Sequence, residues 1–212
     1  MTRVSPADQL SIALPKGRLE VRAVELLRSR GYDITVPDRQ LVAEDTDGRV
    51  RVMLVKNSDL PTYVYHGIAG LGICGTDVIY ESGYEFFRLL ELPFGHTRMC
   101  LASRTDHDPE QDTGRLRVAS KYTRFARDYF QERGIPCEII KLAGSVELAP
   151  VLGLAPYIVD LVETGNTLIA NNLHVVKELE EIKVVLIANP AYYKFHYKSI
   201  DALVDTLREG RA

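Results

Sequence analysis

The feature that most constrains the fold of this sequence is an alternation of short apolar runs with segments of helical periodicity. The runs 10–14 and 157–162 are rich in Leu, Ile and Val and have the length of buried strands. Between such runs lie amphipathic segments such as 18–30, whose aliphatic residues share one helical face and which Gly31 ends. Strands that alternate with helices are typical of α/β folds, so we expect that class.

The same periodicities predict the other elements of the chain. We expect further strands at 50–55, 71–74, 98–102, 117–119, 138–142 and 182–188, and further helices at 60–66, 124–133, 146–152 and 200–208, with one more beginning at Asn166.

Composition argues against two classes of partner. The chain has 212 residues and a net charge of -3, which gives no general basic surface for nucleic acid. The most apolar stretch, 148–162, is interrupted by Pro150, Pro156 and Asp160 and is too short to span a bilayer. The N-terminus does not have the pattern of a signal peptide, so we expect a cytoplasmic protein without a membrane partner.

The cysteines and histidines do not predict a metal centre. Cys74, Cys100 and Cys137 lie far apart, in or beside apolar runs, and we interpret them as buried thiols in a reducing compartment. The five histidines do not cluster, and no zinc-binding spacing, phosphate-binding P-loop or nucleophile elbow is present. We therefore expect no metal held by the protein alone.

The strongest chemical feature is the turn that follows the apolar run 157–162. A turn that leads from a strand into a helix presents backbone N–H groups, hydroxyls and a helix dipole to one point, which suits a phosphate. Gly165 allows a ligand to approach the backbone closely, and Asp160 can accept hydrogen bonds from ribose hydroxyls or face a bound cation. The alternative is an ordinary joint in which a threonine caps the helix. The candidate residues are Asp160, Glu163, Thr164, Gly165, Asn166 and Thr167.

A second candidate site follows the first predicted strand. Lys16 and Arg18 flank Gly17 at the start of a helix. Polyphosphate is bound by such groups, a mobile point charge and a bidentate fork with open backbone between them. The alternative is a solvated basic turn.

Two predicted strands in the middle of the chain are followed by a third group of polar residues. Ser120 ends one strand, and Gly144 and Ser145 open a helix after the other. Glu147 can bind ribose or magnesium there. The alternative is that Ser145 caps the helix while Glu147 favours its N-terminal dipole.

The segment 67–81, GIAGLGICGTDVIYE, resembles a hallmark of the type II periplasmic-binding-protein fold. That resemblance implies two α/β lobes with the active site in the cleft between them and two chain crossings, near 94–100 and 180–188. We expect lobe one to comprise 1–95 plus 185–212, and lobe two to comprise 96–184 and to carry the turn at 163–167.

The segment 147–168 resembles the signature of ATP phosphoribosyltransferases, the enzymes that begin histidine biosynthesis. The signature places a glutamate, a glycine and an Asp-aliphatic-small-any-Thr-Gly-any-Thr-Leu string at fixed spacing. The matching residues are Glu147, Gly153, Ala155, Asp160, Leu161, Val162, Thr164, Gly165, Thr167 and Leu168. The usual phosphoribosyltransferase motif, with two adjacent acidic residues before Thr-Thr-Gly, is not present.

This resemblance implies a reaction and roles for the candidate residues. The adenine ring of ATP would attack the anomeric carbon of phosphoribosyl pyrophosphate, and pyrophosphate would leave without a covalent intermediate. The loop 163–167 would hold the phosphate of phosphoribosyl pyrophosphate, Asp160 would position that substrate, and Lys16 and Arg18 would neutralise polyphosphate. Mg²⁺ would be bound mainly by substrate oxygens. Weaker lobe-one candidates are Arg39, Lys56, Gly75 and Asp77, and Asp77 either contacts a substrate or caps a helix.

The resemblance also implies partners. We expect the short form of the enzyme, without a C-terminal regulatory domain. Short forms assemble with a regulatory subunit that resembles histidyl-tRNA synthetase, so we expect a hetero-oligomer built on self-dimers. Two rival hypotheses are a small-molecule-binding protein of the same fold without catalysis and a phosphoribosyltransferase that uses another base.

Overall fold

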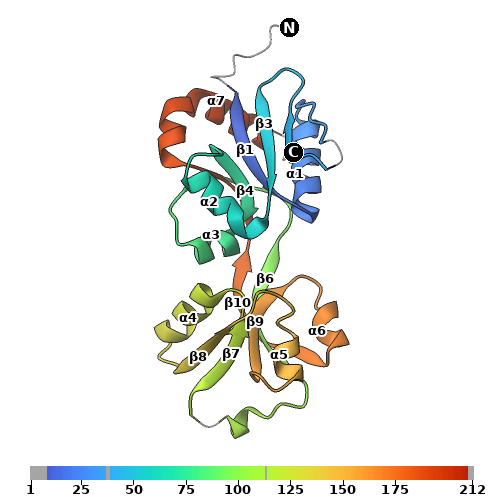
Figure 1. The fold of residues 1–212 in the computed structure, drawn as a ribbon, viewed down its shortest axis with the longest axis vertical. Coiled ribbons are helices and arrows are strands. Elements are labelled where there is room, and N and C mark those ends of the chain that lie inside the picture. The colour runs from blue at the N-terminus through green and yellow to red at the C-terminus, as the bar shows by residue number, and fades with distance from the viewer. Residues whose placement is uncertain (1–8, 37–38, 113, 210–212) are drawn as a thin grey trace. The chain divides into compact units, whose positions relative to one another are not determined.

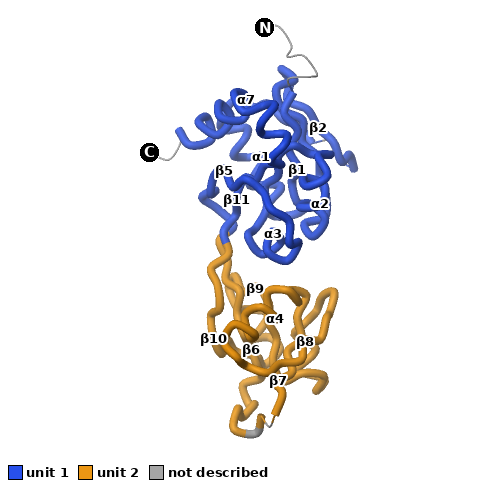
Figure 2. The backbone as a smooth tube through the Cα atoms, turned by 90° about the vertical axis from the view of Figure 1, so that its left-hand side faces the viewer, with its two compact units in different colours: residues 1–95, 183–212 blue, residues 96–182 orange. Residues whose placement is uncertain are grey.

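The computed structural model describes residues 9–36, 39–112 and 114–209. The described chain forms two compact units, which Figure 2 shows in blue and orange. Unit 1 is built from residues up to 95 and from 183 onward, and unit 2 from residues 96–182. The chain therefore leaves unit 1 once and returns once. From the sequence we expect this return after residue 184, whereas it lies after Ile182.

Unit 1 contains a mixed sheet of six strands (Figure 1). The central strand β1 (Leu10–Pro15) pairs in parallel with β3 (Val50–Val55) and with β4 (Leu71–Gly75). The pairings between the other strands of this sheet are antiparallel. The strand order is β2 (Val42–Glu44), β3, β1, β4, β11 (Val184–Ala188) and β5 (Phe87–Glu91). The expected apolar runs therefore form the centre of this sheet.

Helices cover both faces of the unit 1 sheet because its strands are apolar on both sides. Alternate residues of β1 point to opposite faces, so Ile12 and Leu14 join one core and Ala13 the other. The first core packs against α1 (Arg18–Ser29) and α7 (Pro190–Arg208). The second packs against α2 (Leu60–Tyr65) and α3 (Thr76–Ser82).

The long helix α7 is fixed to unit 1 at its first residues. Asn189 caps the helix by accepting hydrogen bonds from the N–H groups of Ala191 and Tyr192, and its amide donates to the carbonyls of Val64 and Tyr65. A Cβ atom at Gly70 would lie 2.1 Å from a carbon of the Tyr192 ring, so this contact requires glycine. The helix is kinked at His196.

Unit 2 contains a second mixed sheet, of five strands. The strands β7 (Leu116–Ser120), β8 (Cys137–Lys141) and β9 (Tyr157–Val162) run parallel to one another. The strands β6 (Thr97–Arg104) and β10 (Leu173–Ile182) complete the sheet in antiparallel pairing, and β10 carries two register shifts.

Both faces of the unit 2 sheet are covered as well. Figure 1 shows α4 (Thr123–Glu132) on one side of the sheet and α5 (Leu148–Val151) and α6 (Asn166–Ala170) on the other. The alternation is clear in β6, where Met99 and Leu101 pack against α4 while Cys100 and Ala102 pack on the α5 and α6 side.

The structure corrects several predicted details. The helix expected at 146–152 is limited to Leu148–Val151, and Ser145 has a φ of 49°, outside the helical region. Cys137 is half-buried on an edge strand, whereas Cys74 and Cys100 are buried as expected. Burial raises the pKa of all three thiols. None of the helices formed by the described residues has the length and apolarity needed to cross a membrane.

Candidate active site

The candidate site of unit 2 lies at the carboxyl ends of its three parallel strands. Ser120 of β7 is level with Lys141 of β8, and it is also level with Val159 of β9. The segments that leave these strands therefore meet at one edge of the sheet, which is where ligands bind in α/β sheets of this kind. The three segments are 121–122, 142–147 and 163–165, and Asp160 lies two residues before the end of β9.

The turn at 163–167 has the backbone geometry that the sequence predicts for a phosphate loop. Gly165 has a φ of 80°, in the left-handed region that glycine adopts without strain, and directly precedes α6. A side chain at this position would meet only Val162, at 3.9 Å, so the space above the turn is open. Glu163, Thr164, Asn166 and Thr167 are exposed, and the Thr164 hydroxyl accepts a long hydrogen bond, 3.5 Å, from the Asn166 N–H.

Asp160 is a largely enclosed carboxylate at this edge of the sheet. Its side chain is 16% exposed, and its Oδ1 lies 3.2 Å from Nζ of Lys121, a residue that is 40% exposed. The Leu161 N–H also donates to Oδ1, at 2.8 Å. Burial raises the pKa of Asp160 above its usual value, the Lys121 ammonium and the Leu161 N–H oppose that rise, and the negative charge of Glu147 adds to it.

Ser120, a candidate from the sequence, does not present its hydroxyl to this edge. The residue is fully buried. Its Oγ donates a hydrogen bond to the Val159 carbonyl at 2.6 Å and accepts one from the Tyr122 N–H at 2.9 Å. The hydrogen-bonding capacity of the hydroxyl is thus used inside the protein. The next residue, Lys121, is the one that reaches Asp160. The sequence signal for Lys121 is its position directly after a buried strand. Successive side chains of a strand point to opposite faces of the sheet, so Lys121 points away from the face that Ser120 occupies.

The segment 142–147 brings a further carboxylate to the same edge. Gly144 and Ser145 are exposed, and Glu147 is half-buried at the residue that precedes α5. The Ser145 side chain makes no described cap to this helix; its carbonyl instead accepts from the Leu148 N–H at 3.1 Å. Glu147 acts electrostatically on Asp160, so the two carboxylates share one environment.

Unit 1 has a corresponding edge at the carboxyl ends of its own parallel strands. The register of β1 with β3 and β4, continued by one to three residues, places Lys16, Lys56 and Gly75 level with one another. Both lysines are exposed, as is Arg18. The Gly17 N–H donates to Oε2 of Glu20 at 3.3 Å, so this helix N-terminus already has an internal carboxylate partner.

The remaining candidates in unit 1 are less open. Asp77 is 3% exposed in the first turn of α3, a position that favours a negative charge. Arg39 is exposed in the connection before β2, with a φ of 62°.

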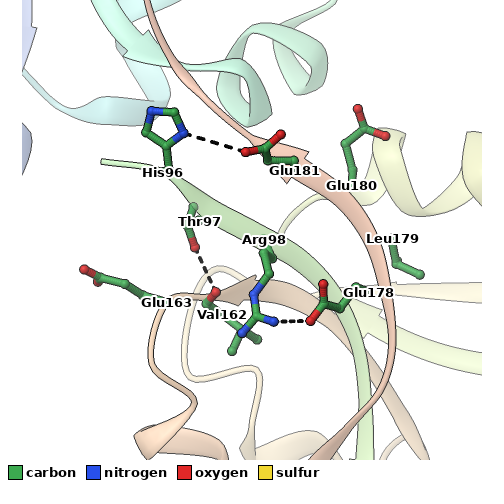
Figure 3. A pocket seen from close by; sticks show the side chains of 9 residues that line it. All are labelled: His96, Thr97, Arg98, Val162, Glu163, Glu178, Leu179, Glu180 and Glu181. Carbon is green, nitrogen blue, oxygen red and sulfur yellow. Dashed lines mark hydrogen bonds and ion pairs between the residues drawn. The ribbon is translucent and has the colours of Figure 1, made fainter. Parts of the chain in front are cut away.

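A pocket in unit 2 adjoins the phosphate turn, but its lining is acidic. Figure 3 shows Arg98 paired with Glu178 of β10 and His96 facing Glu181 of the same strand, 3.7 Å away, while Glu180 points away from both. The pocket also includes Val162 and Glu163. Carboxylates repel phosphate, so the open face of the turn, and not this pocket, is the better phosphate site.

The fold defines a class of protein. Two solved structures share this fold at low sequence identity. The Bordetella pertussis BvgS periplasmic VFT2 domain matches with TM-score 0.61 and 15% identity, over 97% of this chain and 88% of that one. The alkanesulfonate-binding protein SsuA from Xanthomonas axonopodis matches with TM-score 0.56 and 12% identity, over 95% of this chain and 72% of that one. Each unit has the mixed α/β sheet of that class. The chain therefore has a two-lobed fold of the type II periplasmic-binding-protein kind.

More specific comparisons give the family. Residues 56–209 match the family model of ATP phosphoribosyltransferase. The ATP phosphoribosyltransferase of Streptococcus gordonii is 47% identical over 190 residues, which is 88% of each chain, and that of Brachyspira hyodysenteriae is 42% identical over 204 residues, 94% and 98%. The structure of the ATP phosphoribosyl transferase (HisG:HisZ) complex from Thermotoga maritima matches with TM-score 0.84 and 34% identity, over 95% of this chain and 98% of that one.

The chain belongs to the ATP phosphoribosyltransferase family. Its activity is the transfer of a phosphoribosyl group from phosphoribosyl pyrophosphate to ATP, with release of pyrophosphate, at the start of histidine biosynthesis.

Proposed function

We propose that the carboxyl edge of the unit 2 sheet is the phosphoribosyl pyrophosphate site of this enzyme. The observation that carries the proposal is the placement of the enclosed Asp160 carboxylate next to an open, glycine-containing turn on the same strand. A carboxylate suits ribose hydroxyls, which are hydrogen-bond donors, and the turn suits the 5-phosphate. The two groups of one substrate are thus matched by the end of β9 and by the turn that follows it.

Each residue of the turn has a distinct contribution in this proposal. The N–H groups around Gly165 point toward the phosphate, and the hydroxyls of Thr164 and Thr167 donate hydrogen bonds to it. Glu163 and Asn166 contribute their backbone. The exposed fractions of these side chains support the proposal, because none of them is committed to the core.

The chemistry requires alignment and charge stabilisation more than proton transfer. The adenine nitrogen attacks the anomeric carbon while pyrophosphate departs, so the protein must hold the ribose still and stabilise the leaving negative charge. Asp160 fixes the ribose through its hydroxyls. On unit 1 we assign Lys16 and Arg18, with Lys56 and the backbone of Gly17 and Gly75, to the polyphosphate of the substrates.

Magnesium enters this scheme as an ion bound to the substrate. Mg²⁺ binds through one or two carboxylates together with substrate phosphates, and Glu147 is the carboxylate in unit 2 that would complete such a shell. When bound, the ion neutralises the diphosphate. Asp160 is left to the ribose because its Oδ1 already accepts from Leu161.

A regulatory partner is the last part of the proposal. The Thermotoga maritima relative was solved as a HisG:HisZ complex, and we propose that this chain, a cytoplasmic protein, forms a hetero-oligomer with a subunit of the HisZ kind, built on self-dimers. Large apolar side chains at the surface support an assembly: Leu152, Ile169 and Phe195 are 76%, 71% and 85% exposed.

The test of the site is a pair of binding measurements on Gly165→Val. A valine at a φ of 80° strains the turn, and its side chain enters the space above it. We expect phosphoribosyl pyrophosphate to bind at least about tenfold more weakly, with ATP binding unchanged within about twofold. Equal weakening for both substrates, in a variant with an unchanged melting temperature, would refute the assignment.

A further inference from the structure

Lys121 and Asp160 meet because of the register of two neighbouring parallel strands. Ser120 of β7 is level with Val159 of β9, so the next residues, Lys121 and Asp160, lie side by side at the strand ends. The Nζ–Oδ1 distance is 3.2 Å. The pairing follows from the sheet itself, and it brings an ammonium group into the centre of the proposed ribose site.

The two partners of this ion pair are unequally enclosed. Asp160 is 16% exposed and forms part of the strand, whereas Lys121 is 40% exposed and follows the end of β7. The Lys121 ammonium is carried on a flexible four-carbon stem, and in the position that contacts Asp160 it also lies 5.0 Å from the centre of the Tyr122 ring. The carboxylate is therefore the fixed partner and the ammonium the movable one.

We propose that Lys121 is a substrate-binding residue that holds Asp160 in the unliganded protein and binds the diphosphate of phosphoribosyl pyrophosphate when ribose hydroxyls replace it on that carboxylate. The inference rests on the proposed function of the unit 2 edge. The 5-phosphate end of the substrate belongs to the turn at 163–167, which follows Asp160 in β9. Lys121 approaches the same carboxylate from the neighbouring strand β7, so it faces the other anionic end of the substrate, the diphosphate.

The exchange has a physical basis in charge. Ribose hydroxyls can replace the ammonium as hydrogen-bond donors to Asp160, but they carry no positive charge, so the freed ammonium must find another anion. The diphosphate carries more negative charge than the carboxylate it replaces. In the reaction, the same ammonium would stabilise the charge that grows on pyrophosphate as it leaves.

The test compares two ligands that differ only in the diphosphate. Binding of phosphoribosyl pyrophosphate and of ribose 5-phosphate is measured calorimetrically, with magnesium, for the wild type, Lys121→Met, Asp160→Asn and the double variant. We expect Lys121→Met to weaken phosphoribosyl pyrophosphate binding by roughly 10- to 100-fold. Ribose 5-phosphate binding should not weaken, because in the wild type this ligand displaces the ammonium from Asp160 without offering it a diphosphate. In the Asp160→Asn background, Lys121→Met should still weaken phosphoribosyl pyrophosphate binding by about tenfold.

A purely structural role of Lys121 predicts a different pattern. If the ammonium only neutralises Asp160, removing it will weaken both ligands equally and will have no effect once Asp160 is Asn; either result overturns the proposal. Lys141→Met is the matched control, since Lys141 is an exposed lysine at the end of the neighbouring strand β8. An equal loss in that variant would show a general electrostatic effect and would also overturn it. If Lys121→Met does not fold, Lys121→Gln, which can still donate to Asp160, is tested for the same difference between ligands.

Failure of the proposed function can be distinguished from failure of this inference. If Gly165→Val leaves phosphoribosyl pyrophosphate binding intact, the site itself is elsewhere. If Gly165→Val weakens binding but Lys121→Met does not, the site stands and only the role of Lys121 is wrong.

Discussion

The Arg49 guanidinium donates two hydrogen bonds to the Asp45 carboxylate, from Nε to Oδ2 at 2.9 Å and from Nη2 to Oδ1 at 3.0 Å. The Asp45 side chain is fully buried and also accepts from the Asp33 N–H at 2.9 Å. Arg49 lies over the Tyr32 ring, 4.5 Å from its centre. These contacts tie the β2–β3 hairpin to the loop after α1, at a distance from the candidate site residues.

We therefore expect Asp45→Asn to destabilise the protein without altering its substrate specificity. Loss of charged hydrogen bonds inside the protein costs roughly 1.5–3 kcal/mol of unfolding free energy, which urea unfolding followed by circular dichroism can measure. Asp106→Asn is the control, because Asp106 also pairs with an arginine, Arg104, but in an exposed position. A control variant destabilised as much as Asp45→Asn would contradict the importance we give to burial.

The same pair predicts a dependence of stability on pH. Burial acts to raise the pKa of Asp45, but hydrogen bonds from Arg49 and from the Asp33 N–H outweigh it, so the pKa lies below its usual value. An aspartate with a lowered pKa stabilises the fold fully above its unfolded-state pKa, about 3.9, and loses that contribution as the pH falls further. The difference in unfolding free energy between wild type and Asp45→Asn should therefore shrink below about pH 4. A difference that stays constant down to about pH 2.5 would argue against this linkage.

Thr167→Ala should act mainly on phosphoribosyl pyrophosphate. The hydroxyl is exposed on the first turn of α6, and its loss removes one hydrogen bond to a charged group, about 10- to 100-fold in binding. ATP binding should change little. Thr105→Ala serves as the control, since Thr105 is an exposed threonine of unit 2 outside the turn. Fluorescence or calorimetric titration with each substrate separates the two cases.

Lys16→Ala should lower turnover while leaving the melting temperature close to that of the wild type. Lys16 is exposed, and only its backbone N–H, which donates to the Val55 carbonyl at 2.9 Å, takes part in the sheet. Arg22→Ala, at another exposed position on α1, controls for the loss of one positive charge. A fall in melting temperature large enough to account for the lost activity would mean that Lys16 is structural.

Histidine should inhibit this enzyme only when a regulatory subunit is bound. Inhibition requires a site whose affinity for histidine differs between two states, and we place that site on the HisZ-like partner. The measurement is activity against histidine concentration for the chain alone and with its partner. Strong, saturable inhibition of the isolated chain would place the sensor within these 212 residues and contradict the short-form assignment.

The central strands could be predicted from the sequence because they are buried on both faces. The predicted bounds of β3 and β9 agree with those observed, since each is a mostly apolar run, interrupted only by Arg51 or by Asp160, that ends at a polar turn. Among the edge strands, β8 was predicted at 138–142 and the three-residue β2 was missed, as were β5 and β10. The sequences of β5 and β10, FRLLE and LHVVKELEEI, are charged because an edge strand has one neighbour and an exposed side.

Helix α7 shows a second limit of pattern analysis. Its second half was predicted because Ile200, Leu203, Val204 and Leu207 form a buried stripe. Its first half is rich in aromatic and basic residues without such a stripe, and it is set by the Asn189 cap and by the ring contact at Gly70. Both depend on residues far apart in sequence, which periodicity does not detect.

The candidate site was predictable by motif but not by side-chain direction. The turn at 163–167 and Asp160 stand out in the sequence. Whether Ser120 or the following residue, Lys121, points toward Asp160 depends on the face of the sheet that each side chain takes at the end of β7. The face that each side chain takes is set by the register of β7 against β9, and these two strands are about 40 residues apart in the sequence.

The pairing of Thr97 with Ile182 has a consequence for how the chain folds. These residues lie near the two ends of unit 2, so the segment 96–182 starts and finishes on adjacent strands. In a disordered state this segment would be a long loop, and bringing its ends together for the return to unit 1 would cost roughly 4 kcal/mol of chain entropy. Once unit 2 has folded, the two ends are already neighbours, and the β5 and β11 strands of unit 1 can pair as if only a short hairpin joined them. Unit 2, which is one continuous segment, thus lowers the entropy cost of assembling unit 1 from its two separate segments.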